Sequence, residues 1–213
     1  MSDTGLRERK KRRMYRVLSD TAIRLFVERG FDAVSVAEVA AAAEVSKPTL
    51  FRYFPAKEDL VLYRIADHQE EAARVVAQGP TPAEALRRHF LAGLERGDPV
   101  TGLNDDPEVL AFHRLLYGTP ALVARLYGHL ERSEEALARA LGGDLEARLA
   151  AGQVVAVQRV LAQENWRRIA AGERAADLRA EAVAAAERAF ELLAGGVRRL
   201  VQPSSTAPAP VTE

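Results

Sequence analysis

Glycine- and proline-containing breaks divide this chain of 213 residues into segments with the apolar spacing of α-helices, and none with the sustained alternation of strands. The segments between the breaks are rich in alanine, leucine, arginine and glutamate, and aromatic residues make up only 6% of the chain. Because these residue types favour helix, the sequence predicts an all-α fold. The breaks lie at Gly79–Pro82, Gly97–Pro99, Gly118–Pro120, Gly142–Gly143 and Gly172.

Cap signals and apolar spacing set the expected helices and domains. The helices, with their caps, are expected over residues 7–29, 35–43, 46–54, 57–78, 82–95, 107–117, 120–141, 145–171 and 176–201. We expect residues 1–60 to form a small domain of three helices followed by the start of a fourth, and residues 61–201 to form a larger helical body. Residues 202–213 are rich in proline, serine and threonine, so they are predicted to be a disordered tail.

Several classes of protein are excluded by what the chain lacks. It has no cysteine, so it can form no disulfide or thiolate metal site, and a reducing cytoplasm is expected. No apolar run is long enough to span a membrane, and no apolar core follows the basic N-terminus, so we expect no signal peptide. The four histidines show no H-x-x-x-H spacing, and the pair His68 and Glu71 has a commonplace helical spacing. We therefore predict no enzyme, no metal and no cofactor.

Positive charge is concentrated near the N-terminus. Residues 1–60 hold 12 basic and nine acidic residues, a net charge of +3, although the whole chain is neutral. The basic residues of the first 16 are Arg7, Arg9, Lys10, Lys11, Arg12, Arg13 and Arg16. Such an excess suits a polyanion such as DNA, and it equally suits a solvated basic tail.

Two short capped helices follow the first long helix. Ser35 and Glu38 have the spacing of a capping box, and Ser46 is the expected cap of the next helix. Leu50 and Phe54 are four residues apart, so they share the face that should pack inward. Two short helices joined by a tight turn predict a helix-turn-helix, although such hairpins are also common packing units.

The residues themselves favour DNA binding. From Phe26 to Leu60 the chain reads FVERGFDAVSVAEVAAAAEVSKPTLFRYFPAKEDL, which resembles the signature of the tetracycline-repressor (TetR) family. The match over about residues 9–64 combines the glycine turn, the capped helices and the Thr49–Phe54 segment followed by Lys57 and Glu58. Two positions depart from the family pattern: Phe51 replaces a usual tyrosine, and Ala56 replaces the usual polar cap.

The resemblance implies DNA contacts for the second of the two short helices, residues 46–54, which we call the reading helix. Lys47, Pro48 and Phe51 would approach base edges, while Thr49, Tyr53 and Lys57 would contact phosphates. Arg52 could reach a guanine, a phosphate, Glu44 or only solvent. The full set of predicted DNA-contacting residues is Ser35, Ala37, Ser46, Lys47, Pro48, Thr49, Phe51, Arg52, Tyr53 and Lys57.

The last helix carries an apolar seam with heptad-like spacing. Its members are Val183, Ala186, Phe190, Leu193, Val197 and Leu200. The seam could be buried within its own subunit, but the resemblance places the last two long helices at a dimer interface. The sequence therefore predicts dimerisation through this seam.

The resemblance also implies an effector cavity among the central helices. The predicted effector contacts are His89, His113, Tyr117, Tyr127, Asn165 and Trp166. Each of these could instead be an ordinary core or surface residue. Few charged candidates occur, which favours a partly apolar small molecule.

The resemblance implies a homodimeric repressor of palindromic double-stranded DNA that a small-molecule effector releases. Residues 1–60 would be its helix-turn-helix domain, and residues 61–201 its effector-binding and dimerisation domain. The fourth helix would transmit effector binding from the body, residues 61–201, to the helix-turn-helix domain, which we call the reader. The alternative is a helical binding or scaffold protein without DNA function, and an activator is a variant that the sequence leaves open.

Overall fold

The computed structural model describes residues 3–66 and 68–201, and within them every regular element is a helix, as predicted. The predicted tail, residues 202–213, lies outside the described residues. The elements are α1 (Asp3–Arg29), α2 (Val36–Ala42), α3 (Lys47–Tyr53), α4 (Lys57–Ala66), α5 (Glu71–Val75), η1 (Val76–Gln78), α6 (Pro82–Arg96), η2 (Pro99–Thr101), α7 (Pro107–Gly118), α8 (Pro120–Ala140), α9 (Leu145–Ala170) and α10 (Ala175–Val201). Most boundaries fall within a few residues of those expected.

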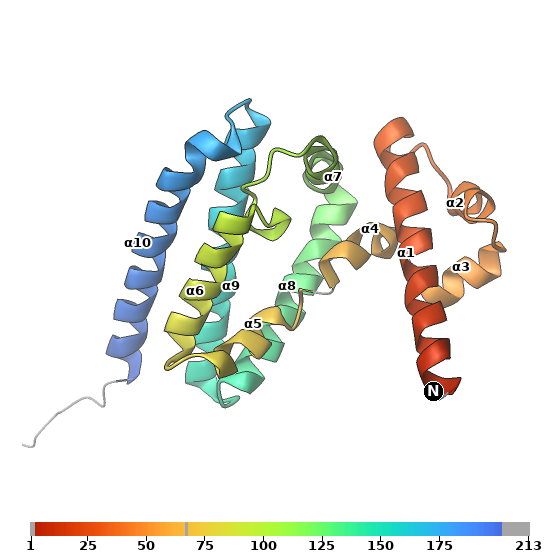
Figure 1. Cartoon of the computed structure of the whole chain (residues 1–213). Helices are drawn as coiled ribbons and strands as arrows, with labels where there is room; N and C mark the ends of the chain where they lie inside the picture. The colour runs from red at the N-terminus through yellow and green to blue at the C-terminus, as the bar shows by residue number, and fades with distance from the viewer. Residues whose placement is uncertain (1–2, 67, 202–213) are drawn as a thin grey trace, which may run out of the picture.

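Two buried apolar clusters organise these helices. The first joins α1–α4 to α7 and the start of α8, with Phe26, Leu50, Leu60 and Phe112 among its members. The second is built mainly from α6, α8, α9 and α10. Figure 1 shows α1–α3 at one side of the molecule, α6, α9 and α10 at the other, and α4 lying between them. The expected domain boundary at residue 60 therefore falls inside a helix, α4, that shares its core with the body.

The prediction of one helix over residues 57–78 is wrong, because helix α4 ends at Ala66. Single three-residue turns follow, in which the amides of His68 and Gln69 donate to the carbonyls of Ile65 and Ala66. The Gln69 side chain hydrogen-bonds His129 of α8. Local helix preference is a weak guide that tertiary context often overrides, and this segment departs from it.

The predicted dimer seam on α10 also needs correction. Ala186, Phe190 and Leu193 are buried within the single chain, where α10 packs on α6 and α9, and Phe190 is only 3% exposed. The Phe190 ring lies 6.0 Å from that of Phe90 on α6. Val183 packs against the same cluster, and the side chains of Val197 and Leu200 lie outside the described residues. The described part of the seam is therefore subunit core, because heptad spacing equally fits a helix packed on its own chain.

A short turn of 3₁₀-helix, η2, is pressed against α9 at a glycine. Gly102 has φ +71°, and a Cβ there would lie 2.0 Å from the carbonyl oxygen of Ala162. Asn165 fixes the same turn, because its side-chain amide donates to the Thr101 carbonyl over 2.9 Å. Only glycine meets both the left-handed backbone and the close approach.

We predict that Gly102→Ala destabilises the fold far more than Gly97→Ala. Both glycines have left-handed φ, but a Cβ at Gly97 meets nothing closer than 3.8 Å. Gly97→Ala should therefore cost about 1 kcal/mol, and Gly102→Ala about 2–4 kcal/mol because overpacking is added. Urea unfolding followed by circular dichroism measures both, and equal losses would contradict the close packing of η2 on α9.

Candidate DNA interface and ligand cavity

The capping box predicted at the start of α2 is confirmed. The Ser35 hydroxyl accepts from the Glu38 amide over 3.2 Å, and the Glu38 carboxylate accepts from the Ser35 amide over 2.8 Å. Glu38 also pairs with Arg29 at 2.6 Å, which ties α2 to the end of α1. The Ser35 amide, followed by the Arg29 guanidinium, lowers the pKa of the Glu38 carboxyl to about 2. Glu38 is therefore ionised near pH 7, and the bonds that hold the N-terminus of α2 remain in place.

The turn between α2 and α3 contains a strained residue that sequence reasoning missed. Glu44 has φ +56°, the sole non-glycine residue with positive φ in the described chain. The Val45 amide donates to the Ala40 carbonyl over 2.9 Å, and the Glu44 amide donates to that of Ala41 over 3.1 Å. This pattern ends α2 and reverses the chain, a task usually given to glycine.

The cap predicted for α3 is also confirmed. The Ser46 hydroxyl accepts from the Thr49 amide over 3.2 Å and lies 2.8 Å from the Thr49 hydroxyl. Leu50 and Phe54 are buried, as expected from their shared face. The opposite face presents exposed side chains, namely Lys47, Pro48, Phe51 and Arg52.

Two cations on this exposed face have no acidic partner among the residues described. Lys47 Nζ lies 5.8 Å from the centre of the Phe51 ring, and the Arg52 guanidinium lies 5.8 Å from that of Tyr53. Arg52 therefore packs on its neighbour rather than pairing with Glu44. Phe51 is 40% exposed, which is unusual for a large apolar side chain. Unpaired cations beside an exposed ring suit contact with phosphates and bases.

Lys57, a predicted phosphate contact, is partly engaged within the chain. Its Nζ donates to the Phe31 carbonyl and lies 4.2 Å from the centre of the Phe31 ring and 5.2 Å from that of Phe26. An ammonium group carries three donors, so one bond to the protein leaves others for a phosphate.

The basic run at the N-terminus forms the first turns of α1. Figure 1 shows this end of α1 extending beyond α2 and α3. The exposed basic side chains of this segment are Arg7, Arg9, Lys10, Lys11, Arg12 and Arg13. A positive helix end beside the reading helix is therefore available to a polyanion.

Helix α4 is held at its first turn by both halves of the molecule. Ala56 lacks a polar side chain, but its amide donates to the Asp59 carboxylate over 3.2 Å. The same carboxylate accepts two bonds from Arg125 of α8, at 2.9 and 3.1 Å. The buried Ser19 hydroxyl of α1 donates to the Leu60 carbonyl over 2.7 Å.

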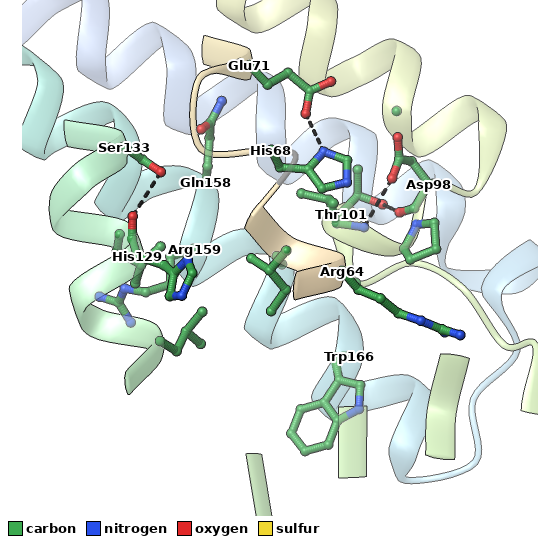
Figure 2. Close-up of a pocket in the computed structure, with 18 of the residues that line it drawn as sticks. Arg64, His68, Glu71, Asp98, Thr101, His129, Ser133, Gln158, Arg159 and Trp166 are labelled. Carbon is green, nitrogen blue, oxygen red and sulfur yellow. Dashed lines mark hydrogen bonds and ion pairs between the residues drawn. The ribbon is translucent and has the colours of Figure 1, made fainter. Parts of the chain in front are cut away.

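A cavity of about 430 Å³ opens at the other end of α4. Its lining comes from α4, α5, α6, η2, α7, α8 and α9 and is largely apolar, and Figure 2 shows a part of it. This volume falls within the range of about 300–1,000 Å³ typical of small-molecule sites. Apolar lining residues include Ile65, Phe90, Val100, Phe112, Leu116, Leu126, Leu130 and Val155.

All four histidines of the chain line this one cavity. Glu71 joins two of them, because its carboxylate oxygens lie 2.6 Å from His68 Nδ1 and 3.1 Å from His89 Nε2. The bond to His68, drawn in Figure 2, is the main cause of a lowered pKa at Glu71. His129 contacts Gln69 from the turn after α4. No group of side chains in the described residues has the geometry to hold a metal ion.

An aromatic wall carries two polar atoms without partners. His113 Nδ1 and Trp166 Nε1 are buried and have no hydrogen-bond partner among the described residues. The Trp166 ring lies 6.3 Å from that of His113 and 4.8 Å from that of Tyr117. Burial alone lowers the pKa of His113 from 6.5 to about 4, so this ring is neutral near pH 7. The aromatic wall therefore carries polar atoms but no charge near pH 7.

Four of the six predicted effector contacts meet at this cavity: His89, His113, Tyr117 and Trp166. The other two do not line it. Tyr127 is 54% exposed, and Asn165 is buried behind the wall, where it holds η2. Sequence reasoning missed His68 and Glu71, although their i,i+3 spacing was visible, because spacing alone could not show that both face a cavity.

A helix-turn-helix with an exposed reading face, joined by one helix to a cavity-bearing body, defines a DNA-binding transcriptional regulator. Residues 18–63 match the family described as bacterial regulatory proteins, tetR family. The HTH-type transcriptional regulator TcmR of Streptomyces glaucescens is 32% identical over 177 residues, which cover 77% of this chain and 78% of TcmR. The chain therefore belongs to the tetR family, a family of regulators.

Solved structures share the same fold. NalD of Pseudomonas aeruginosa superposes with a TM-score of 0.56 and 18% identity over 88% of this chain and 96% of NalD. FadR of Bacillus subtilis superposes with a TM-score of 0.53 and 19% identity over 85% of this chain and 98% of FadR. No helix in the described part of the chain is long and apolar enough to cross a membrane.

We predict that His113 stays neutral in the folded protein from pH 8 down to about pH 5. Its folded pKa is lowered to about 4 from 6.5, so the unfolded chain binds this proton first and stability falls as the pH drops below 6.5. Side-chain nitrogen NMR over a pH series measures the titration, with His113→Gln assigning the signal. A midpoint near 6.5 would contradict the burial of this ring.

Proposed function

We propose that this protein is a homodimeric repressor that binds palindromic DNA through α3 and leaves it when a small molecule fills the cavity. The observation that carries the proposal is the position of α4. Its first turn lies in the core shared with the reader, and its last turn supplies Arg64 and Ile65 to the cavity wall. We propose no catalytic role for the protein. We also propose that it acts in the bacterial cytoplasm, where the DNA that it would regulate is found.

The release step follows from the two ends of α4. A ligand that displaces Arg64 and Ile65 would move the helix against α8, to which Asp59 is bound through Arg125. Because Ser19 ties Leu60 to α1, the reader would move with it. The ligand must bind the released form more tightly than the DNA-bound form, since only unequal affinity shifts the equilibrium.

Two proteins of the same fold support the general scheme. NalD is described as the secondary repressor of the MexAB-OprM multidrug efflux pump, and FadR was solved in complex with stearoyl-CoA. These descriptions apply to those proteins, and they support repression and ligand binding here only as a proposal.

In the proposed complex, α3 enters the major groove from its N-terminal end. Lys47, Pro48 and Phe51 would approach base edges there, while Thr49 and Tyr53 would contact phosphates. Ser35 and Lys57 would add contacts from the starts of α2 and α4, Ala37 would offer a methyl group, and Ser46 would hold the end of α3. A twofold dimer would place its two reading helices about 34 Å apart, one turn of DNA.

The proposed dimer interface is the outer surface of α9 and α10, since the inner seam of α10 is subunit core. This surface carries exposed apolar side chains, among them Leu149 and Val160 of α9 and Leu192 of α10. Leu192 is 78% exposed, the highest value among the exposed large apolar residues. Apolar side chains on two adjacent long helices suit a helical interface between subunits.

We predict that Lys47→Ala weakens sequence-specific DNA binding by about tenfold or more, because a base contact contributes about 1–3 kcal/mol of discrimination. Fluorescence anisotropy measures binding to a duplex selected by the wild-type protein and to a scrambled duplex, across a salt series. Arg139→Ala, an exposed cation on α8, is the matched control and should bind like wild type.

A wild-type preference of about 10³-fold for the selected duplex would support a sequence-specific regulator. Equal binding to both duplexes, lost steeply with salt, would indicate that only the basic end of α1 is at work. Normal binding by Lys47→Ala would contradict the proposed reading residues.

We predict that Leu192→Glu weakens the dimer by about tenfold or more, since burying an unpaired carboxylate costs at least the about 1.4 kcal/mol that this change represents. Sedimentation velocity over a concentration series measures the association. Val27→Glu, at an exposed apolar position on α1, is the control. A monomeric wild type at micromolar concentration, or an unchanged Leu192→Glu variant, would contradict the proposed interface.

A further inference from the structure

The charged groups that line the cavity are, with one exception, already paired. Arg64 pairs with Asp20 of α1 at 3.0 Å. Glu71 is held by two histidines. Asp98 accepts from the Val100 amide over 3.1 Å and lies 3.7 Å from Arg96. These groups therefore have partners within the protein and do not require a charged ligand.

Arg159 of α9 is the exception. Its guanidinium donates to the side-chain oxygen of Gln163 over 3.0 Å and lies 6.0 Å from the centre of the Tyr127 ring. No carboxylate among the described residues lies within ion-pair distance of it. In the view of Figure 2, Arg159 lies well apart from the carboxylates of Glu71 and Asp98. The cavity thus holds one half-buried cation that lacks a counter-charge.

The field of Arg159 reaches the aromatic wall. Burial raises the pKa of the Tyr117 hydroxyl, and the positive charge of Arg159 acts against that rise. The Tyr117 ring lies 4.8 Å from that of Trp166. A cation, a hydroxyl and two aromatic rings therefore belong to the lining of the same cavity.

We propose that Arg159 is an anion subsite, and that the cavity selects a planar, largely apolar ligand bearing one acidic group, such as a carboxylate or phenolate. The acidic group pairs with Arg159 while the ring system packs against Tyr117 and Trp166. An uncharged ligand of the same shape would remove water from the guanidinium without supplying a counter-charge. Leaving a cation desolvated and unpaired in an apolar cavity costs free energy. This inference rests on the proposed function, because it assumes that the cavity is the effector site.

Two dyes that differ only in an acidic group test the subsite. They are 8-anilinonaphthalene-1-sulfonate, which is anionic, and N-phenyl-1-naphthylamine, the same ring system without the sulfonate. Trp166 is the single tryptophan of the chain and lines the cavity, so energy transfer from it reports a dye bound in or near the cavity. Each dye is titrated into the full-length wild type and into Arg159→Gln, Arg159→Lys and Arg148→Gln. Arg148 is an exposed cation on the same helix that does not line the cavity.

The wild type should bind the anionic dye about tenfold more tightly than the neutral one, as expected for one charge-assisted pair. Arg159→Gln should abolish this preference and leave the neutral dye unchanged, whereas Arg159→Lys should keep part of it. Arg148→Gln should behave like wild type. Circular dichroism checks that each variant is folded.

Three results would overturn the subsite alone. The first two are equal wild-type affinity for both dyes, and a loss of preference in Arg148→Gln equal to that in Arg159→Gln. An equal loss of both dyes in Arg159→Gln would assign the residue a merely structural role and would also overturn it. If neither dye quenches Trp166, the cavity is not a ligand site, and the proposed effector mechanism falls with the subsite.

Discussion

The carboxylate of Asp59 is the group on which the arrangement of the molecule depends. It accepts a hydrogen bond from the amide of Ala56, the residue before helix α4. It also accepts two bonds from Arg125, which attach that helix to α8. Asp59 is mostly shielded from solvent, so these bonds resist screening more than a surface pair would. The same acidic group thus satisfies the amide just before α4 and attaches the first turn of that helix to the body.

The cavity lies at the opposite end of the same short helix, and its polar groups are distributed unevenly. One side holds Glu71 between two histidines, whose ring nitrogens lie 2.6 and 3.1 Å from its carboxylate oxygens. The other side holds Arg159 and the aromatic wall, where one charge and two buried polar atoms lack partners. A cavity with satisfied groups on one side and unsatisfied groups on the other has a built-in direction for ligand binding, because binding gains most where partners are missing.

Local features of the fold could be predicted from the sequence, and long-range ones could not. The caps at Ser35 and Ser46 were predictable because a cap is decided within four residues. The break after Ala66 was not, because no glycine or proline marks it, and the turn that follows meets a residue sixty positions away, where Gln69 contacts His129. The α10 seam was visible as a pattern, but periodicity says only that a face is buried and not which chain buries it.

The site shows the same division. The reading helix could be predicted residue by residue, since its motif is contiguous and its exposed face follows from helical spacing. The cavity gathers side chains from seven elements, so four of its polar residues could be nominated by type alone, while Asn165 proved to hold η2 instead. Arg159 could not be singled out, because only the folded chain reveals that its neighbours lack an acid.

The central claim is that filling the cavity moves the reader through α4, and it can be tested without knowing the effector. The chain has no cysteine, so Ser133→Cys, at a position in the cavity wall, can be alkylated at one site with monobromobimane. Arg148→Cys, alkylated in the same way, is the control outside the cavity. Affinity for the selected duplex is then compared before and after labelling. We expect a loss of about tenfold for labelled Ser133→Cys, within the usual range of coupling between sites, and no change for the control. Complete labelling of Ser133→Cys with unchanged DNA affinity would contradict it.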